Sequence, residues 1–140
     1  MEQLRSLGKL TGLPSLSAIE KLADYSDLNL SVDTRARAWL EVNCAHCHSP
    51  EGPAKTSGLF LMAGVTNPLE LGVGKAPVAA GKGSGGLLYD IVPNKPDQSI
   101  LFFRISSNDP GIMMPELGRS IIHQEGVELI RQWILEMPAN

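Results

Sequence analysis

Two cysteines and a histidine stand close enough in this chain to act as one chemical unit. Residues 44–48 have the sequence Cys-Ala-His-Cys-His and contain both cysteines of the protein. This is the C-x-x-C-H pattern through which c-type haem is attached to protein. Each thiol can add across one vinyl group of haem, and the histidine that follows can bind the iron as its proximal ligand. The pattern therefore predicts one covalent haem c on Cys44, Cys47 and His48.

Other chemistry is open to the same residues. A structural zinc site needs four ligands, and outside the motif only His123 could supply a further histidine. A thioredoxin-like redox pair belongs at a strand-to-helix junction, whereas this motif ends a helical pattern and runs into Pro50-Glu51-Gly52-Pro53. A disulfide and a chance match are the remaining alternatives. The motif rule favours haem, and His46, at an x position, is expected to be a surface or neighbouring residue without required chemistry.

The group on the opposite side of the iron decides the class of function. A second protein ligand gives an electron carrier, whereas an open site gives a gas-binding or catalytic centre. Met114 is favoured because it precedes Pro115 in a loop between two helical patterns, and proline restricts the backbone before it to extended conformations. A methionine sulfur supports both oxidation states of the iron and raises its potential relative to a second histidine. Met113, His123, Met62 and an open site remain alternatives.

Three helical patterns and one shorter piece are expected to position these residues. The first begins at Ser31, a good N-cap followed by an acidic first turn, and leads into the haem motif. The second begins at Pro96 and carries the apolar run 100–105, which by composition could also be a strand; the start signals favour a helix, as does the resemblance described below. The third runs from residue 123 or 124 to 137. A short amphipathic piece at 15–23 adds a fourth helix.

A long stretch without a helical pattern, residues 49–95, lies between the haem motif and the second of these helices. Its many glycines and prolines indicate irregular backbone, which suits a chain wrapped around a cofactor. Two short apolar pieces, 59–62 and 87–92, are expected to be extended and could form a short β-hairpin. The glycine run 81–86 lacks the order of a phosphate-binding loop, so we expect a flexible surface loop or one that approaches the haem edge.

Charge and length limit the classes of partner. The 140 residues carry a net charge of −3, which argues against nucleic acid or an anionic membrane surface as a partner. Residues 96–140 hold three basic and six acidic residues, so a basic or metal-centred redox partner is expected to meet this part of the chain. Lys82 and Arg104 are candidate partners for the haem propionates. No apolar run approaches the length needed to span a bilayer.

The chain resembles the monohaem c-type cytochromes of the helical cytochrome c fold. The resemblance covers about residues 31–140 and rests on the haem motif and on residues 91–119. The latter carry an Ile-Val-Pro … Pro-Asp-x-Ser-Ile-Leu … Met-Met-Pro-Glu-Leu-Gly-Arg pattern, as in bacterial extracytoplasmic cytochrome domains. The resemblance implies a mainly α cytochrome c fold of about four helices around the haem. It also implies thioether attachment at Cys44 and Cys47, with His48 as proximal and Met114 as distal iron ligand.

Domain organisation and location follow from the same argument. Residues 31–140 are expected to form the cytochrome c domain, and residues 1–30 a lead-in or linker remnant packed on it. Residues 1–30 lack the layout of a signal peptide. Because bacteria attach haem to this motif outside the cytoplasm, we expect a periplasmic or secreted protein whose leader or preceding domain is not in this sequence.

The expected function is one-electron transfer, with the protein acting as an electron carrier rather than an enzyme. Similar domains occur alone and fused to larger exported proteins, so a secreted or periplasmic redox enzyme is one expected acceptor. The alternative is a haem-based gas sensor or peroxidase-like enzyme with an open or labile sixth site. Arg119 and His123 lie near the expected distal ligand in sequence and are the polar groups such an enzyme could use.

Overall fold

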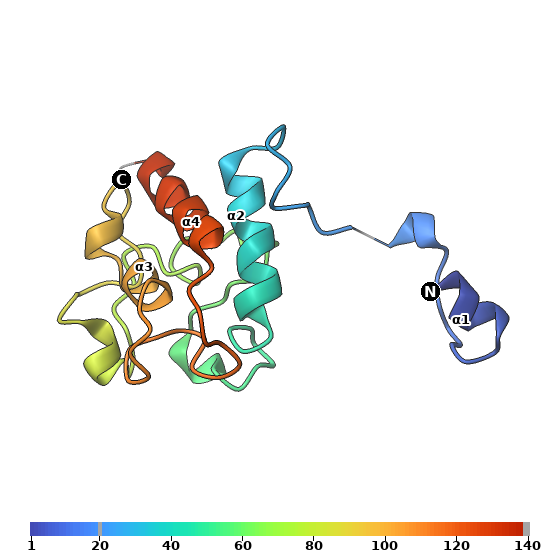
Figure 1. Cartoon of the computed structure of the whole chain (residues 1–140), viewed down its shortest axis with the longest axis horizontal. Helices are drawn as coiled ribbons and strands as arrows, with labels where there is room; N and C mark the ends of the chain where they lie inside the picture. Colours follow the sequence, from blue (N-terminus) through green and yellow to red (C-terminus); the bar gives the residue numbers. More distant parts are fainter. Residues whose placement is uncertain (20, 139–140) are drawn as a thin grey trace.

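The computed structural model of the chain describes residues 1–19 and 21–138, and this part is mainly helical (Figure 1). Within it there is no β-strand, so the predicted mainly α class is confirmed. The α-helices and the shorter 3-10 and π turns, in chain order, are α1 (Glu2–Ser6), η1 (Leu16–Ala18), α2 (Val32–Leu40), η2 (Glu41–Ala45), η3 (Lys55–Ser57), η4 (Gly81–Ser84), η5 (Pro96–Gln98), α3 (Ile100–Ile105) and α4 (Gln124–Glu136).

Helix α2 begins where the sequence predicts. The side chain of Ser31 accepts a hydrogen bond from the backbone N–H of Thr34 at 3.1 Å, which satisfies one of the free donors of the first turn. The helix continues into the π turn η2, which contains Cys44. Beyond it, the backbone N–H groups of Cys47 and His48 both donate to the carbonyl of Cys44, at 3.0 and 2.9 Å. The C-x-x-C-H motif therefore begins in η2 and ends in the hydrogen-bonded turn that follows it.

Helices α2 and α4 cross in close contact, as Figure 1 shows. The crossing depends on Gly126, because a Cβ atom there would lie 2.4 Å from the indole ring of Trp39. A second link joins the helices where the indole N–H of Trp133 donates to Asp33 at 2.7 Å. Only a glycine allows this approach, so residue 126 fixes how close α4 lies to the helix that carries the motif.

The predicted helix from Pro96 is divided in two. Residues 96–98 form the 3-10 turn η5, and α3 begins only at Ile100, because Ser99 between them is extended. Ser99 is fully buried, and its hydroxyl donates to the carbonyl of Lys95 at 2.9 Å and accepts from the N–H of Val92 at 2.9 Å. The backbone N–H groups of Ile100 and Leu101 donate to the carbonyls of Tyr89 and Asp90, at 3.1 and 3.0 Å, so α3 starts on the preceding extended piece and does not continue from η5.

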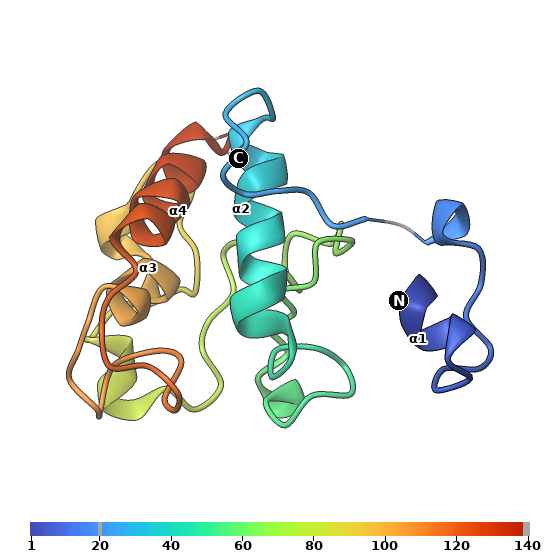
Figure 2. The ribbon, with the colours of Figure 1, turned by 45° about the vertical axis from the view of Figure 1, so that its right-hand side comes forward.

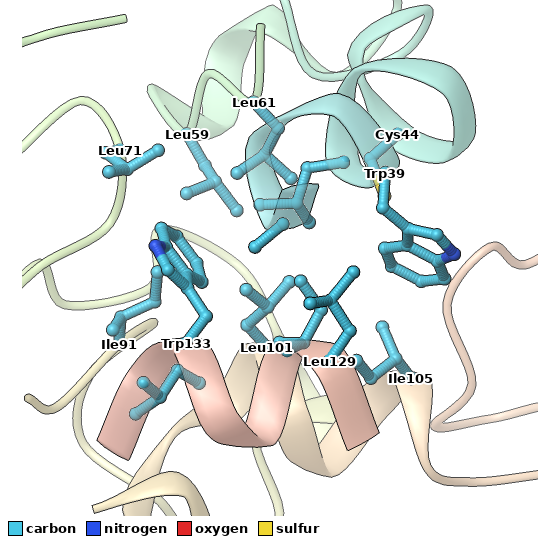
Figure 3. Packing of buried hydrophobic residues seen from close by; sticks show 14 of the residues in the cluster. Trp39, Cys44, Leu59, Leu61, Leu71, Ile91, Leu101, Ile105, Leu129 and Trp133 are labelled. Carbon is cyan, nitrogen blue, oxygen red and sulfur yellow. The ribbon is translucent and has the colours of Figure 1, made fainter. Parts of the chain in front are cut away.

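One apolar core lies between the helices and the middle of the chain. Figure 3 shows Leu101 and Leu129, from α3 and α4, directed toward Leu59, Leu61 and Cys44 on the opposite side. The core residues are Ala36, Trp39, Leu40, Cys44, Leu59, Leu61, Val65, Leu71, Ile91, Leu101, Ile105, Leu129, Ile130, Trp133 and Ile134.

The expected β-hairpin between residues 59–62 and 87–92 does not form within the described part of the chain. The two pieces find backbone partners elsewhere, because Phe60 donates to Glu70 at 2.8 Å and Leu61 donates to His48 at 2.9 Å. Residues 87–92 make only isolated bridges, one of them between Val73 and Ile91. Glycine and proline on both sides interrupt the extended backbone before a ladder can develop.

The N-terminal residues differ in character from the rest. Residues 1–19 contain no buried side chain and extend to one side of the helical domain in Figures 1 and 2. The helix expected at 15–23 is wrong for most of its length, because only Leu16–Ala18 form a 3-10 turn, η1, and residues 21–23 are not helical; residue 20 lies outside the described residues. Tyr25 is tied to α2, since its carbonyl accepts from the Arg35 guanidinium at 2.8 Å. The domain boundary at residue 30 stays a prediction.

No helix within residues 1–19 and 21–138 has the length and apolar character to cross a bilayer.

Candidate functional site

A cavity of about 560 Å³ lies between the motif turn, α3 and the loop after α3. Its volume falls within the roughly 300–1,000 Å³ usual for small-molecule and cofactor sites. All four residues predicted to hold haem line it, although Met114 is far from the motif in sequence. The residues that line it lie in six stretches of chain: 43–48, 53–61, 75–80, 90, 100–105 and 114–117.

The two thiols of the motif are both free but differ in burial. Cys44 is 4% exposed and belongs to the apolar core, whereas Cys47 is half-buried. Burial raises the pKa of the Cys44 thiol to about 12, with a smaller contribution from Cys47. Cys44 is therefore a neutral thiol at physiological pH, and both cysteines line the cavity without forming a disulfide.

His48 is oriented by the backbone of the following loop. Its ring is buried, and Nδ1 lies 3.3 Å from the carbonyl oxygen of Leu59. We assign the Nδ1 proton as the donor in this contact, because a carbonyl can only accept. Burial lowers the pKa of His48, and the Leu59 contact opposes this only in part, so the ring is held neutral. A metal-binding histidine commonly donates its second ring N–H in this way, which leaves Nε2 as the ligand atom.

The loop after α3 brings Met114 to the cavity. The backbone N–H of Met114 donates to the carbonyl of Arg104 at 3.2 Å, and the Met114–Pro115 peptide bond is cis. Of the other candidate ligands, neither Met113 nor Met62 is among the residues that line the cavity. Met114 is thus the methionine that the structure brings beside the motif.

His123 lies at a different place, at the N-terminus of α4. Its Nδ1 accepts a hydrogen bond from the indole N–H of Trp39 at 3.0 Å, and the two rings are stacked. It is not among the residues that line the cavity, and neither is Arg119, which donates to the carbonyls of Ile105 and Ser107. His123, the candidate fourth zinc ligand and a candidate for peroxide chemistry, therefore packs on Trp39. Arg119, the other candidate for peroxide chemistry, contacts backbone carbonyls.

Sequence reasoning missed a buried ion pair at the cavity. Lys75 Nζ lies 3.3 Å from a carboxylate oxygen of Asp90, with side chains only 13% and 9% exposed. Burial raises the pKa of Asp90, and Lys75 opposes this shift. The two residues meet because Asp90 donates its backbone N–H to the Lys75 carbonyl at 2.7 Å. No motif marks this pairing, so only the folded backbone reveals it.

The two candidate propionate partners are placed differently. Arg104 lines the cavity, with its side chain 17% exposed. Lys82 is not among the lining residues and instead pairs with Asp109 at 2.9 Å on the surface. Of the two, only Arg104 contributes a positive charge to the cavity.

The donor set of the cavity fits a c-type haem. Two free thiols, a neutral imidazole with one nitrogen available and a thioether are the groups that such a haem uses. The walls between them are largely apolar and include Leu59, Leu61, Ile100, Leu101 and Ile105, as a porphyrin requires.

Fold and site together define a small, mainly helical domain built around a cavity lined by cysteine, histidine and methionine. Comparison with known proteins gives no narrower class, because no family model, no curated protein and no solved structure matches the chain.

Proposed function

We propose that this protein is a c-type cytochrome that carries single electrons. The observation that supports this most strongly is the cavity shared by Cys44, Cys47, His48 and Met114. The first three belong to one sequence motif, but Met114 reaches the same cavity through a loop 66 residues beyond His48. If the C-x-x-C-H sequence were a chance match, it would not be expected to share a cavity with Met114, the methionine that the sequence favours as a ligand.

The cysteines serve as anchors in this proposal. Cys44 and Cys47 would hold haem by adding their thiols to its two vinyl groups, which would keep the porphyrin at the turn formed by residues 44–48. Since Cys44 is part of the apolar core, the attachment couples the cofactor directly to the packing of α2 and α4. Haem, when bound, supplies the one-electron couple of its iron.

Two residues, His48 and Met114, would hold the iron in both oxidation states. His48 offers Nε2, while its Nδ1 contact with Leu59 keeps the ring from turning. Met114 offers a neutral sulfur, which favours the reduced state and raises the potential relative to a second histidine. The apolar side chains among the cavity walls would lower the polarity around the iron and strengthen its electrostatic interactions with nearby charges.

The proposal includes a redox partner protein and an extracytoplasmic location, because haem is attached to this motif outside the bacterial cytoplasm. The excess of acidic residues in 96–140 suits a basic or metal-centred partner. Encounter with such a partner is expected to slow as ionic strength rises.

The direct test of the cofactor is covalent attachment. The wild-type chain, expressed with the haem-attachment machinery of an exporting host, should keep its haem during denaturing electrophoresis. The double variant Cys44→Ser, Cys47→Ser should lose haem completely under these conditions, because a serine hydroxyl does not form the thioether. A wild-type chain that carries no haem after maturation in such a host would contradict the proposal.

A further inference from the structure

Arg104 contacts the Met114 loop on both sides of the methionine. Its Nε donates to the carbonyl of Ile112 at 2.8 Å, and its terminal NH2 group lies 3.3 Å from a carboxylate oxygen of Glu116. These two residues stand two positions before and two positions after Met114. The backbone carbonyl of Arg104 also accepts a hydrogen bond from the N–H of Met114, at 3.2 Å.

The Arg104 side chain is closely packed. Arg104 lies in the last turn of α3, and its side chain is only 17% exposed. A Cβ atom on Gly83 would lie 3.1 Å from the guanidinium carbon, so the backbone of η4 packs closely against it. The planar fork of an arginine can donate in two directions from one fixed plane, which a lysine cannot do.

We propose that Arg104 is a positioning residue for the sulfur of Met114, and this rests on the proposed function above. By holding residues 112 and 116 together, the guanidinium keeps the intervening turn in the conformation that directs Met114 to the cavity. Its two hydrogen bonds are directed to the loop, so its role differs from that of the propionate partner predicted from sequence. Without Arg104 the loop gains conformations in which the sulfur is away from the iron, and foreign ligands then compete more successfully.

The test uses ferric holoprotein and imidazole, a ligand that must displace methionine from the iron. In wild type we expect the weak long-wavelength band of sulfur-to-iron ligation and weak imidazole binding. Arg104→Ala should reduce that band and raise the apparent imidazole affinity by about tenfold or more. Arg104→Lys keeps the positive charge but lacks the planar guanidinium. Its band intensity and imidazole affinity should lie between those of wild type and Arg104→Ala.

Two further variants separate positioning from other roles. Lys82→Ala removes a surface ion pair to Asp109 in the same loop and should keep the wild-type band and imidazole affinity. Glu116→Ala removes one of the two side-chain contacts from an exposed position, so it should fold normally and raise imidazole affinity by a few-fold. It therefore keeps the proposal testable if Arg104→Ala does not accumulate.

The outcomes are distinct. Unchanged band and imidazole affinity in Arg104→Lys and Glu116→Ala would overturn the positioning role, and so would an equal effect of Lys82→Ala. A purely structural role would lower the unfolding temperature of the Arg104 variants without changing their imidazole affinity. If wild type itself lacks the sulfur-to-iron band, Met114 ligation has failed, which is a different result from failure of the Arg104 proposal.

Discussion

The Nδ1 atom of His48 lies 3.3 Å from the carbonyl oxygen of Leu59, and this contact determines which ring nitrogen His48 can offer to a metal. Because Leu59 lies eleven residues further along the chain, the loop after the motif, and not the motif itself, orients the ring. The C-x-x-C-H motif therefore needs the fold around it to orient its histidine.

The first prediction concerns this histidine. His48→Ala should give little or no stable holoprotein, because the iron loses its proximal ligand while both thioether anchors remain. The measurement is the haem-to-protein ratio and absorption spectrum of the purified chain. His46→Ala is the matched control, because His46 lines the same cavity but stands at an x position of the motif and is exposed, so this variant should leave both unchanged. Normal haem incorporation and spectrum in His48→Ala would contradict the ligand assignment.

The second prediction separates the adjacent methionines of the loop. Met114→Ala should open the iron to carbon monoxide in the ferrous state and lower the reduction potential by on the order of 0.1 V, because the axial ligand is the strongest control of haem potential. Met113→Ala should do neither, since Met113 is not among the residues that line the cavity. The measurements are a ferrous carbon monoxide spectrum and a redox titration. The assignment is wrong if the two variants behave in the reverse order.

The helix that carries the motif, its N-cap and the C-terminal helix could be predicted from sequence because each has a local cause. Ser31 has a hydrogen-bonding side chain directly before an apolar period, and residues 124–136 carry one apolar stripe. The division of the second helix at Ser99 could not be predicted in this way. It depends on a buried hydroxyl whose partners, Lys95 and Val92, lie on the preceding turn and extended piece.

For the site, too, sequence predicts the local features but not the contacts that depend on the fold. The motif and the Met114-Pro115 dipeptide are local signals, so these residues could be selected before their meeting at one cavity was known. Lys75 and Asp90 give no such signal, because they stand fifteen positions apart in a stretch without a motif and are brought together by backbone pairing. His123 was considered a ligand on chemistry alone, whereas its stacking on Trp39 depends on how α2 and α4 cross.

The third prediction tests that crossing. Gly126→Ala should lower the free energy of unfolding by about 1–3 kcal/mol, because a Cβ there would lie 2.4 Å from the Trp39 ring and force α4 outward. Gly64→Ala is the control, since nothing lies within 4 Å of its Cβ position, and it should change stability by about 0.5 kcal/mol or less. Both values come from denaturant unfolding of the holoprotein. Equal stability of the two variants would contradict the observed helix contact.

The fourth prediction concerns removal of the cofactor. In the haem-free chain at pH 8, an alkylating reagent should modify Cys47 before Cys44, because only the thiolate reacts and Cys44 is buried with its pKa raised to about 12. At pH 8 that pKa leaves roughly one Cys44 thiol in 10,000 ionised. Mass spectrometry of the digested chain measures the order of modification. In denaturant both cysteines should react alike, and in the holoprotein neither should react. Equal rates without denaturant would show that the haem-free chain does not keep this packing.

The proposal of a His48 and Met114 ligated haem is tested most directly by one set of absorption spectra, recorded ferric, ferrous and ferrous with carbon monoxide. We expect a low-spin spectrum, the weak long-wavelength sulfur-to-iron band in the ferric state, and no change on addition of carbon monoxide. A high-spin spectrum, or rapid binding of carbon monoxide by the wild-type ferrous protein, would contradict methionine ligation and with it the assignment as an electron carrier.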